Sequence, residues 1–188
     1  MFEQVTAYLK RRKLRRLIKS KKVSVSFMQD VDLSRTNFSR MQINGSKMKN
    51  ANLKKTNFQY ANLQGSMMNN ANLTNANLSH TNLIYVNFSG ADLSGANLSN
   101  AKLYKTNFEG ANLSYVNLYN ARLDPTTNFT NANLTNAIFD EEKLMRCIIV
   151  GATIKPLSFL DSVLYYAFGY KKQNLKTVVP MNIYPSTN

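Results

Sequence analysis

The sequence predicts a solenoid, a rod of stacked coils in which the chain turns a corner in every repeat. A large apolar residue recurs every five positions from Met28 to Leu123, twenty times in succession. We call each of these large residues the centre of its repeat. The residue two positions before the centre is Ala, Ser, Thr or Val in nineteen of the twenty repeats, with Met41 as the exception. A period of five fits neither a helix, with about 3.6 residues per turn, nor a strand, in which side chains alternate. A large and a small inward residue in each repeat therefore require a chain that turns repeatedly.

The repeats also carry a short motif. Asn or Asp precedes the large residue in fourteen of the twenty repeats, as in Ala51-Asn52-Leu53, Ala91-Asp92-Leu93 and Ala111-Asn112-Leu113. This pattern resembles the pentapeptide-repeat family, whose motif reads A-(D/N)-L-X-X, from residue 26 to about 154. The resemblance implies an all-β solenoid, a right-handed quadrilateral β-helix with four repeats per coil. The Asn side chains suit its corners, because their amides can bond nearby backbone groups.

Four repeats per coil place centres twenty residues apart in one ladder. The resulting ladders hold like residues: Leu33, Leu53, Leu73, Leu93 and Leu113 in one, Met28, Met48, Met68, Phe88 and Phe108 in another. Phe38 and Phe58 share a third ladder, and Ile43, Leu63, Leu83, Leu103 and Leu123 form the fourth. Similar side chains pack without voids in a repeating core, so the sequence supports this stacking.

The register slips once along the chain. The next centre after Leu123 is Phe129, six residues on, and Pro125 marks a loop between them. The new register continues through Leu134, Phe139, Leu144, Ile149 and Ile154. It fits the motif less well at Leu144, because Glu142 occupies the position of the small residue. Twenty-six centres at four per coil predict about 6.5 coils. Cys147 holds a small inward position and is expected to be a buried structural thiol.

The three predicted regions are residues 1–25, 26–155 and 156–188. The first is expected to be a basic capping helix, the second the β-helix, and the third a helix followed by an extended tail. The C-terminal helix carries more apolar surface than one coil end can cover, which predicts a protein interface or a homodimer. Its proposed interface residues are Phe159, Leu160, Val163, Leu164, Tyr166 and Phe168.

The net charge of +14 is concentrated near the N-terminus, where residues 1–22 hold nine Lys and Arg against Glu3. Such a charge favours RNA or DNA, an acidic protein face or an anionic membrane surface as partner. The predicted polyanion-binding residues are Lys10, Arg11, Arg12, Lys13, Arg15, Arg16, Arg35, Lys47, Lys49, Lys54 and Lys55. The alternative is that residues 1–22 only cap the first coil, with their charges in solvent.

Other surface residues point to binding rather than to catalysis. Outward tyrosines at Tyr85, Tyr104, Tyr115 and Tyr119 suggest a protein interface, because tyrosine is enriched there. The single histidine, His80, lies at an outward position, and neither a phosphate-binding loop nor a Cys/His metal motif occurs. The acidic run at residues 140–142 is expected to be a solvated turn. We therefore expect no catalytic residues, no cofactor and no metal.

The leading functional hypothesis is a non-catalytic scaffold that docks in a larger assembly through its basic N-terminal end and its C-terminal helix. One alternative is a nucleic-acid or ribosome-binding module. The other is a DNA mimic acting on a type II topoisomerase, an activity that the resemblance to Qnr and MfpA proteins implies. A DNA mimic requires an acidic stripe, so the positive body ranks that alternative last. Because no secretion signal or transmembrane segment is recognised, we expect the cytoplasm or an organelle interior, with peripheral membrane contact left open.

Overall fold

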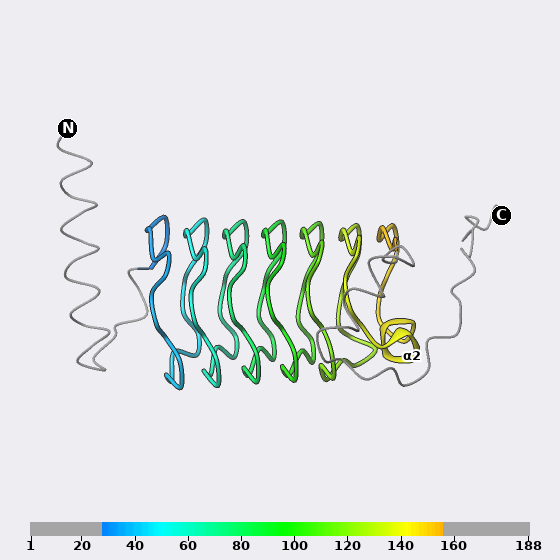
Figure 1. The fold of residues 1–188 in the computed structure, drawn as a ribbon, viewed down its shortest axis with the longest axis horizontal. Coiled ribbons are helices and arrows are strands. Elements are labelled where there is room, and N and C mark those ends of the chain that lie inside the picture. The colour runs from blue at the N-terminus through cyan, green and yellow to red at the C-terminus, as the bar shows by residue number, and fades with distance from the viewer. Residues whose placement is uncertain (1–27, 156–188) are drawn as a thin grey trace, which may run out of the picture. The chain divides into compact units, whose positions relative to one another are not determined.

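The computed structural model describes residues 28–155, which wind into successive coils along one axis (Figure 1). Isolated parallel β-bridges join residues twenty positions apart, beginning with Asp32–Asn52. Twenty residues correspond to four repeats, so the predicted stacking of four-repeat coils is confirmed. The described residues contain no helix long and apolar enough to cross a membrane. The expected N-terminal and C-terminal helices lie outside the described residues, and the three-region division stays a prediction.

Each repeat consists of one bridging residue and one turn. In the turn, the N–H of the next small residue donates to the carbonyl of the large one, as from Ala76 to Leu73 at 2.9 Å. The residue before it has positive φ, for example 56° at Asn75. The Asn or Asp side chain then accepts from the backbone N–H two residues on, as Asn77 does from Ser79 at 3.1 Å. The Asn side chains thus tie the turns, as the motif predicted.

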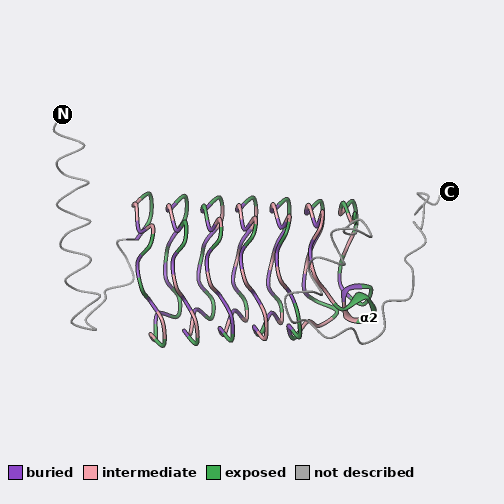
Figure 2. Ribbon diagram, in the orientation of Figure 1, coloured by how far each residue is buried: buried purple, intermediate pink, exposed green. Residues whose placement is uncertain are grey.

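The core lies inside the coils and consists of the ladders of large residues (Figure 2). Phe38 stacks on Phe58 with ring centroids 4.9 Å apart, which confirms that these residues share a ladder. Of the twenty-six centres, twenty-two are buried. The other four centres are partly buried and pack against this core: Leu123, Phe139, Ile149 and Ile154. All four lie beyond residue 120, where the regular repeat is interrupted.

The predicted register slip is present at a corner. The bridges Asn107–Asn128, Asn112–Asn133 and Asn117–Ile138 join residues twenty-one positions apart, so the coil absorbs the extra residue near Pro125. Thr126 and Thr127 donate hydrogen bonds to the Asp124 side chain at this corner. Partial burial would raise the pKa of Asp124, but the hydrogen bonds from Thr126, the Lys105 N–H and Thr127 together lower it.

One repeat of the last coil is replaced by a helix, which corrects the expected repeat centred on Leu144. Helix α2 (Glu141–Leu144) begins at Asp140, whose side chain accepts a hydrogen bond from the Lys143 N–H. The bridges resume at Ile148, which pairs with Asn128. A Glu in the small inward position would bury a charge, so the chain turns outward as a helix and returns with Leu144 buried.

Cys147 follows this helix and is buried, as predicted. Burial raises the pKa of the Cys147 thiol to about 11, with a smaller contribution from the negative charge of Asp124. The thiol is therefore protonated at neutral pH and a weak nucleophile. This agrees with a structural role.

A glycine at a turn gives the first testable prediction. Gly95 has φ of +66°, and a Cβ there would lie 2.5 Å from Asn75 Oδ1 in the preceding coil. Gly110 has a similar φ of +63°, but its Cβ would meet nothing within 4 Å. We expect Gly110→Ala to lower the free energy of unfolding by about 1 kcal/mol, because of its backbone conformation alone. Gly95→Ala should lower it further, because the Asn75 side chain must also move.

Urea denaturation of the two variants measures this difference. The additional loss of unfolding free energy caused by Gly95→Ala should disappear when the change is made in an Asn75→Ala background and compared with Asn75→Ala alone. Equal losses in the two single variants would contradict the close approach of Gly95 to Asn75.

Candidate anion-binding surfaces

The first coils of the described region carry a cluster of exposed cations, which we call the basic end. It consists of six residues: Arg35, Arg40, Lys47, Lys49, Lys54 and Lys55. All six stand at outward positions, because the register places the two residues after each centre and the one before it outside the coil. The position of each charge on the rod thus follows from its place in the repeat.

The coil brings several of these cations together although they are far apart in sequence. The Arg35 N–H donates to the Lys54 carbonyl at 2.9 Å, so Arg35 lies directly against Lys54 and Lys55 of the next coil. Lys47 and Lys49 precede Lys54 around one corner of the same coil. The register thus places Arg35 beside Lys54 and Lys55, and the binding of one polyanion by residues 35, 47, 49, 54 and 55 stays a prediction. The other predicted polyanion-binding residues, 10–13, 15 and 16, lie outside the described residues.

The basic end has an excess of positive charge. Between residues 28 and 70 the acidic residues are Asp30 and Asp32, against six Lys and Arg. Asp30 accepts a hydrogen bond from Asn50 Nδ2 at 2.8 Å. The ion pairs found within residues 28–155 join Lys143 to Asp140 and Arg146 to Glu142, far from this end. Exposed cations concentrated in this way attract anions, with a strength that salt reduces.

The outward tyrosines form two separate pairs rather than one surface. The Tyr85 N–H donates to the Tyr104 carbonyl at 3.1 Å, which places these two tyrosines on adjacent coils of one side. Tyr115 is 61% exposed and Tyr119 is 55% exposed. They lie on the two sides of the coil that come, along the chain, just before the side that carries Tyr85 and Tyr104. Lys105 Nζ lies 3.1 Å from Tyr85 Oη and 5.0 Å from the ring centroid. The hydrogen bond with Tyr85, followed by the electrostatic interaction with the same residue, raises the pKa of Lys105.

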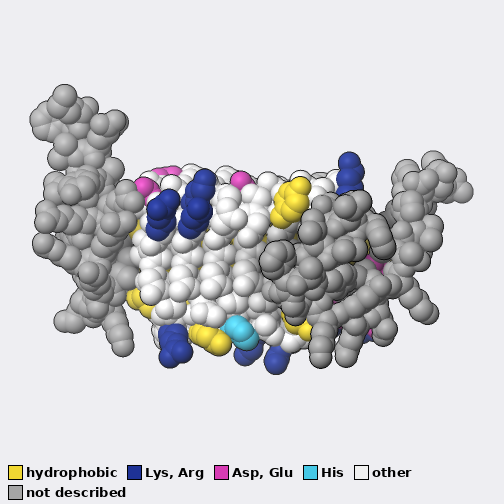
Figure 3. All heavy atoms as spheres, viewed as in Figure 1, with side chains coloured by type: hydrophobic (Ala, Val, Ile, Leu, Met, Phe, Trp, Pro, Cys, Tyr) yellow, Lys and Arg dark blue, Asp and Glu magenta, His cyan; other side chains and the backbone are white. Residues whose placement is uncertain are grey.

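Sequence reasoning missed a second surface, which we call the edge groove. This open groove of about 280 Å³ is lined by Tyr60, His80, Asn100, Lys102, Asn120 and Arg122. His80 is exposed as predicted, but its ring also stacks on Tyr60, with centroids 4.7 Å apart. In Figure 3 the single histidine lies between hydrophobic and basic side chains along the lower edge of the rod. Comparing outward residues twenty positions apart would have revealed this alignment.

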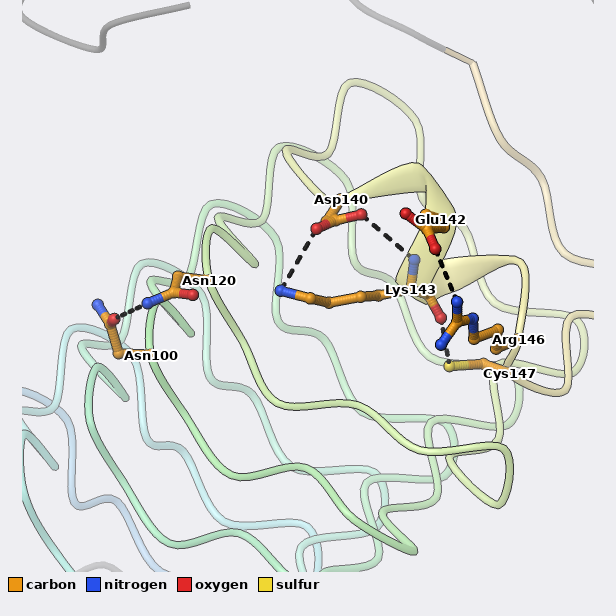
Figure 4. A network of polar contacts seen from close by, with 7 residues as sticks. All are labelled: Asn100, Asn120, Asp140, Glu142, Lys143, Arg146 and Cys147. Carbon is orange, nitrogen blue, oxygen red and sulfur yellow. Dashed lines mark hydrogen bonds and ion pairs between the residues drawn. The ribbon is translucent and has the colours of Figure 1, made fainter. Parts of the chain in front are cut away.

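The acidic run forms part of helix α2 and is used in local contacts. Asp140 lies 3.3 Å from Lys143 Nζ, and Glu142 accepts from Arg146 at 2.6 Å (Figure 4). Within residues 28–155 no group of three or more His, Cys, Asp or Glu side chains could hold a metal ion. The expected solvated turn is thus a short exposed helix.

Comparison with known proteins identifies the repeat. A family model described as pentapeptide repeats matches in eight copies, with matched segments at 28–59, 42–75, 56–95, 71–110 and 91–124. Together these segments span residues 28–124, which is 97 of the 188 residues and just over half of the chain. The search of curated proteins finds no match to the chain.

Solved structures of pentapeptide repeat proteins are also similar to the chain. Rfr23 from the cyanobacterium Cyanothece 51142 is 27% identical, with 58% of this chain and 65% of that one covered and a TM-score of 0.44. HetL from Nostoc sp. strain PCC 7120, described as involved in regulating heterocyst differentiation, is 22% identical, with coverages of 68% and 76% and a TM-score of 0.34. QnrB1, a plasmid-mediated fluoroquinolone resistance protein, is 15% identical, with coverages of 81% and 94% and a TM-score of 0.32. The chain thus spans just under two thirds of the length of Rfr23.

Proposed function

Because this chain belongs to the pentapeptide-repeat family, we propose that it is a non-catalytic scaffold that docks in a larger assembly through its basic end. The observation that carries this proposal is the gathering of six exposed Lys and Arg in the first coils. The stacked coils hold these charges at fixed spacing, so little conformational entropy of the backbone is lost on binding. The partner surface is therefore a polyanion, bound mainly by release of its counterions.

The proposal extends to both ends of the chain. The cations at residues 10–13, 15 and 16 would continue the basic end, and the apolar residues between 159 and 168 would bind a protein or a second copy of the chain. These residues lie outside the described range, so their roles rest on composition. Together they would let the β-helix link an anionic surface to a protein partner.

The described charges favour this scaffold over a DNA mimic. A mimic needs a continuous acidic stripe, whereas Asp92 and Glu109 lie on different sides of the rod. The three acids at residues 140–142 are consecutive, and two of them form ion pairs. Residues 28–155 carry twelve Lys and Arg against eight acids, a net charge of +4.

Salt-dependent RNA binding tests the basic end. The probe is a fluorescent single-stranded RNA of mixed sequence, measured by anisotropy between 50 and 200 mM salt. Each phosphate contact with single strands contributes about 0.7 to the slope of log affinity against log salt. The variant with Lys47, Lys49, Lys54 and Lys55 changed to Gln should therefore lose about 3 from this slope. Its melting temperature should stay close to that of the parent, because all four side chains are exposed.

The control removes charge at the other end of the described region, with Lys143→Gln, Arg146→Gln and Lys155→Gln. This variant should keep the parent slope, since these residues lie away from the basic end. A second variant, with Arg11, Arg12, Arg15 and Arg16 changed to Ser, measures the contribution of the N-terminal residues. If the four Lys→Gln changes leave the slope unaltered, the basic end does not bind polyanions.

A further inference from the structure

The edge groove begins with a column of stacked side chains. The Arg40 guanidinium lies 5.7 Å from the centroid of the Tyr60 ring, and the Tyr60 ring stacks on His80 at 4.7 Å with an interplanar angle of 19°. These three residues occupy the same outward position in three successive coils. Each ring is thus held by the neighbour on its N-terminal side, which gives a preformed aromatic platform.

The same column continues with two short amide side chains. Asn100 and Asn120 take the places where further rings would stand, and Asn120 Nδ2 donates to Asn100 Oδ1 at 2.8 Å (Figure 4). Among the described aromatic contacts, the His80 ring is stacked on Tyr60 alone. Its opposite face therefore borders the groove, next to two amides whose Asn100 Nδ2 and Asn120 Oδ1 atoms take no part in that hydrogen bond.

The other side of the groove carries two neighbouring cations. Lys102 and Arg122 form a parallel bridge pair on adjacent coils, and both side chains are exposed. Earlier coils have amides at this position, where Asn62 Nδ2 donates to Gln42 Oε1 at 3.1 Å. Two like charges in one ladder repel each other, whereas two amides can bond to each other. Neither cation is in the ion pairs found within residues 28–155.

We propose that the edge groove binds a nucleotide, with its base stacked on His80 and its phosphate held by Lys102 and Arg122. Bound phosphate would offset the repulsion between the two cations and accept hydrogen bonds from both. A base has a flat face that stacks on an aromatic ring and an edge that pairs with amides such as Asn100 and Asn120. An acidic peptide would satisfy the cations and leave the aromatic platform unused. The proposal does not depend on polyanion binding at the basic end, because the residues that would contact the nucleotide lie outside that end and hold a single phosphate.

Adenosine 5′-monophosphate is the probe, titrated into the full chain by calorimetry and by amide NMR. We expect the amide NMR signals of residues that line the groove to shift, and those of residues 47–55 to stay unchanged. Adenosine and inorganic phosphate, which each supply half of the recognised chemistry, should bind at least about tenfold more weakly. Binding of inorganic phosphate as tight as that of the nucleotide would overturn the role of the base.

Three variants separate stacking from charge. His80→Ala should weaken binding of the nucleotide by about tenfold, because the platform is lost. Lys102→Gln with Arg122→Gln should weaken it by about tenfold or more, because both charged donors are lost. The charge-matched control, Arg146→Gln with Lys155→Gln, should bind like the parent. An equal loss in this control, or an unchanged affinity in His80→Ala, would overturn the proposal.

An adenosine decamer of single-stranded RNA distinguishes the two sources of the nucleotide. If the groove reads one nucleotide within a strand, the decamer binds more tightly than the monophosphate, and His80→Ala weakens both. If the groove takes a free nucleotide, it does not contribute to binding of the decamer. His80→Ala then weakens binding of the monophosphate alone. The RNA-binding test of residues 47–55 has a separate readout, so either proposal can fail without the other.

Discussion

Replacement of Leu73 by aspartate is expected to unfold the β-helix. The Leu73 side chain is 0% exposed and lies in the ladder between Leu53 and Leu93. A carboxylate at this position finds neither water nor a cation, so it must stay buried and charged or take up a proton, and both cost free energy. Each coil is stabilised by its neighbours, so disruption in the middle of the rod weakens the coils on both sides.

Circular dichroism and thermal melting measure this effect. The matched control is Asn72→Asp, one residue earlier, where the side chain points outward. Asp92 occupies the equivalent position in the next coil, and its carboxylate accepts from the Ser94 N–H at 2.9 Å. Asn72→Asp should therefore fold, with only a small loss of stability from the like charge of Asp92 beside it in the ladder. A Leu73→Asp variant that melts like the parent would show that the assigned register is wrong.

Replacement of Phe108 by alanine is expected to cost about 3–5 kcal/mol of stability. The Phe108 ring is 0% exposed and stacks on two others, at 5.3 Å from Phe88 and 5.1 Å from Phe129. Alanine removes both stacking contacts and leaves a cavity that the rigid neighbouring coils cannot close.

Chemical denaturation gives the change in the free energy of unfolding. Phe108→Leu is the control, because Leu fills most of the space and Leu centres occupy the other three ladders. It should cost about 1 kcal/mol. If the alanine and leucine variants were equally stable, Phe108 would contribute little to the core.

Most of the β-helix could be predicted from the sequence because its structure is periodic. Once the period of five assigns Leu33 and Leu53 to one ladder, every outward and inward position between Met28 and Leu118 follows. The extra residue near Pro125 was also predictable, because it shifts the next centre by one position. Helix α2 was not predicted, since its four residues are too few for a helical period. Glu142 in a small position was the signal, but it indicates only that the repeat fails.

The candidate sites were predictable in unequal degree. The basic end was found because its charges are also clustered in sequence, between residues 35 and 55. The edge groove was missed because Tyr60, His80 and Asn100 are twenty residues apart and were considered one at a time. Stacking between side chains of successive coils depends on their conformations, which the repeat does not determine. The terminal regions lack a period altogether, so composition alone could not define their structures.

The corner at Pro125 shows how such a rod can change during evolution. One extra residue there leaves the bridges on both sides intact, so small insertions are tolerated at corners. An insertion within a bridging segment would instead move the side chains that follow it from inward to outward positions, and from outward to inward ones. Duplication or loss of twenty residues, by contrast, adds or removes a whole coil and keeps all faces aligned. Each such event would change the length of the β-helix by one coil, about 4.8 Å. Gene-length changes can thus lengthen or shorten the β-helix in uniform steps while the outward positions of its coils stay aligned.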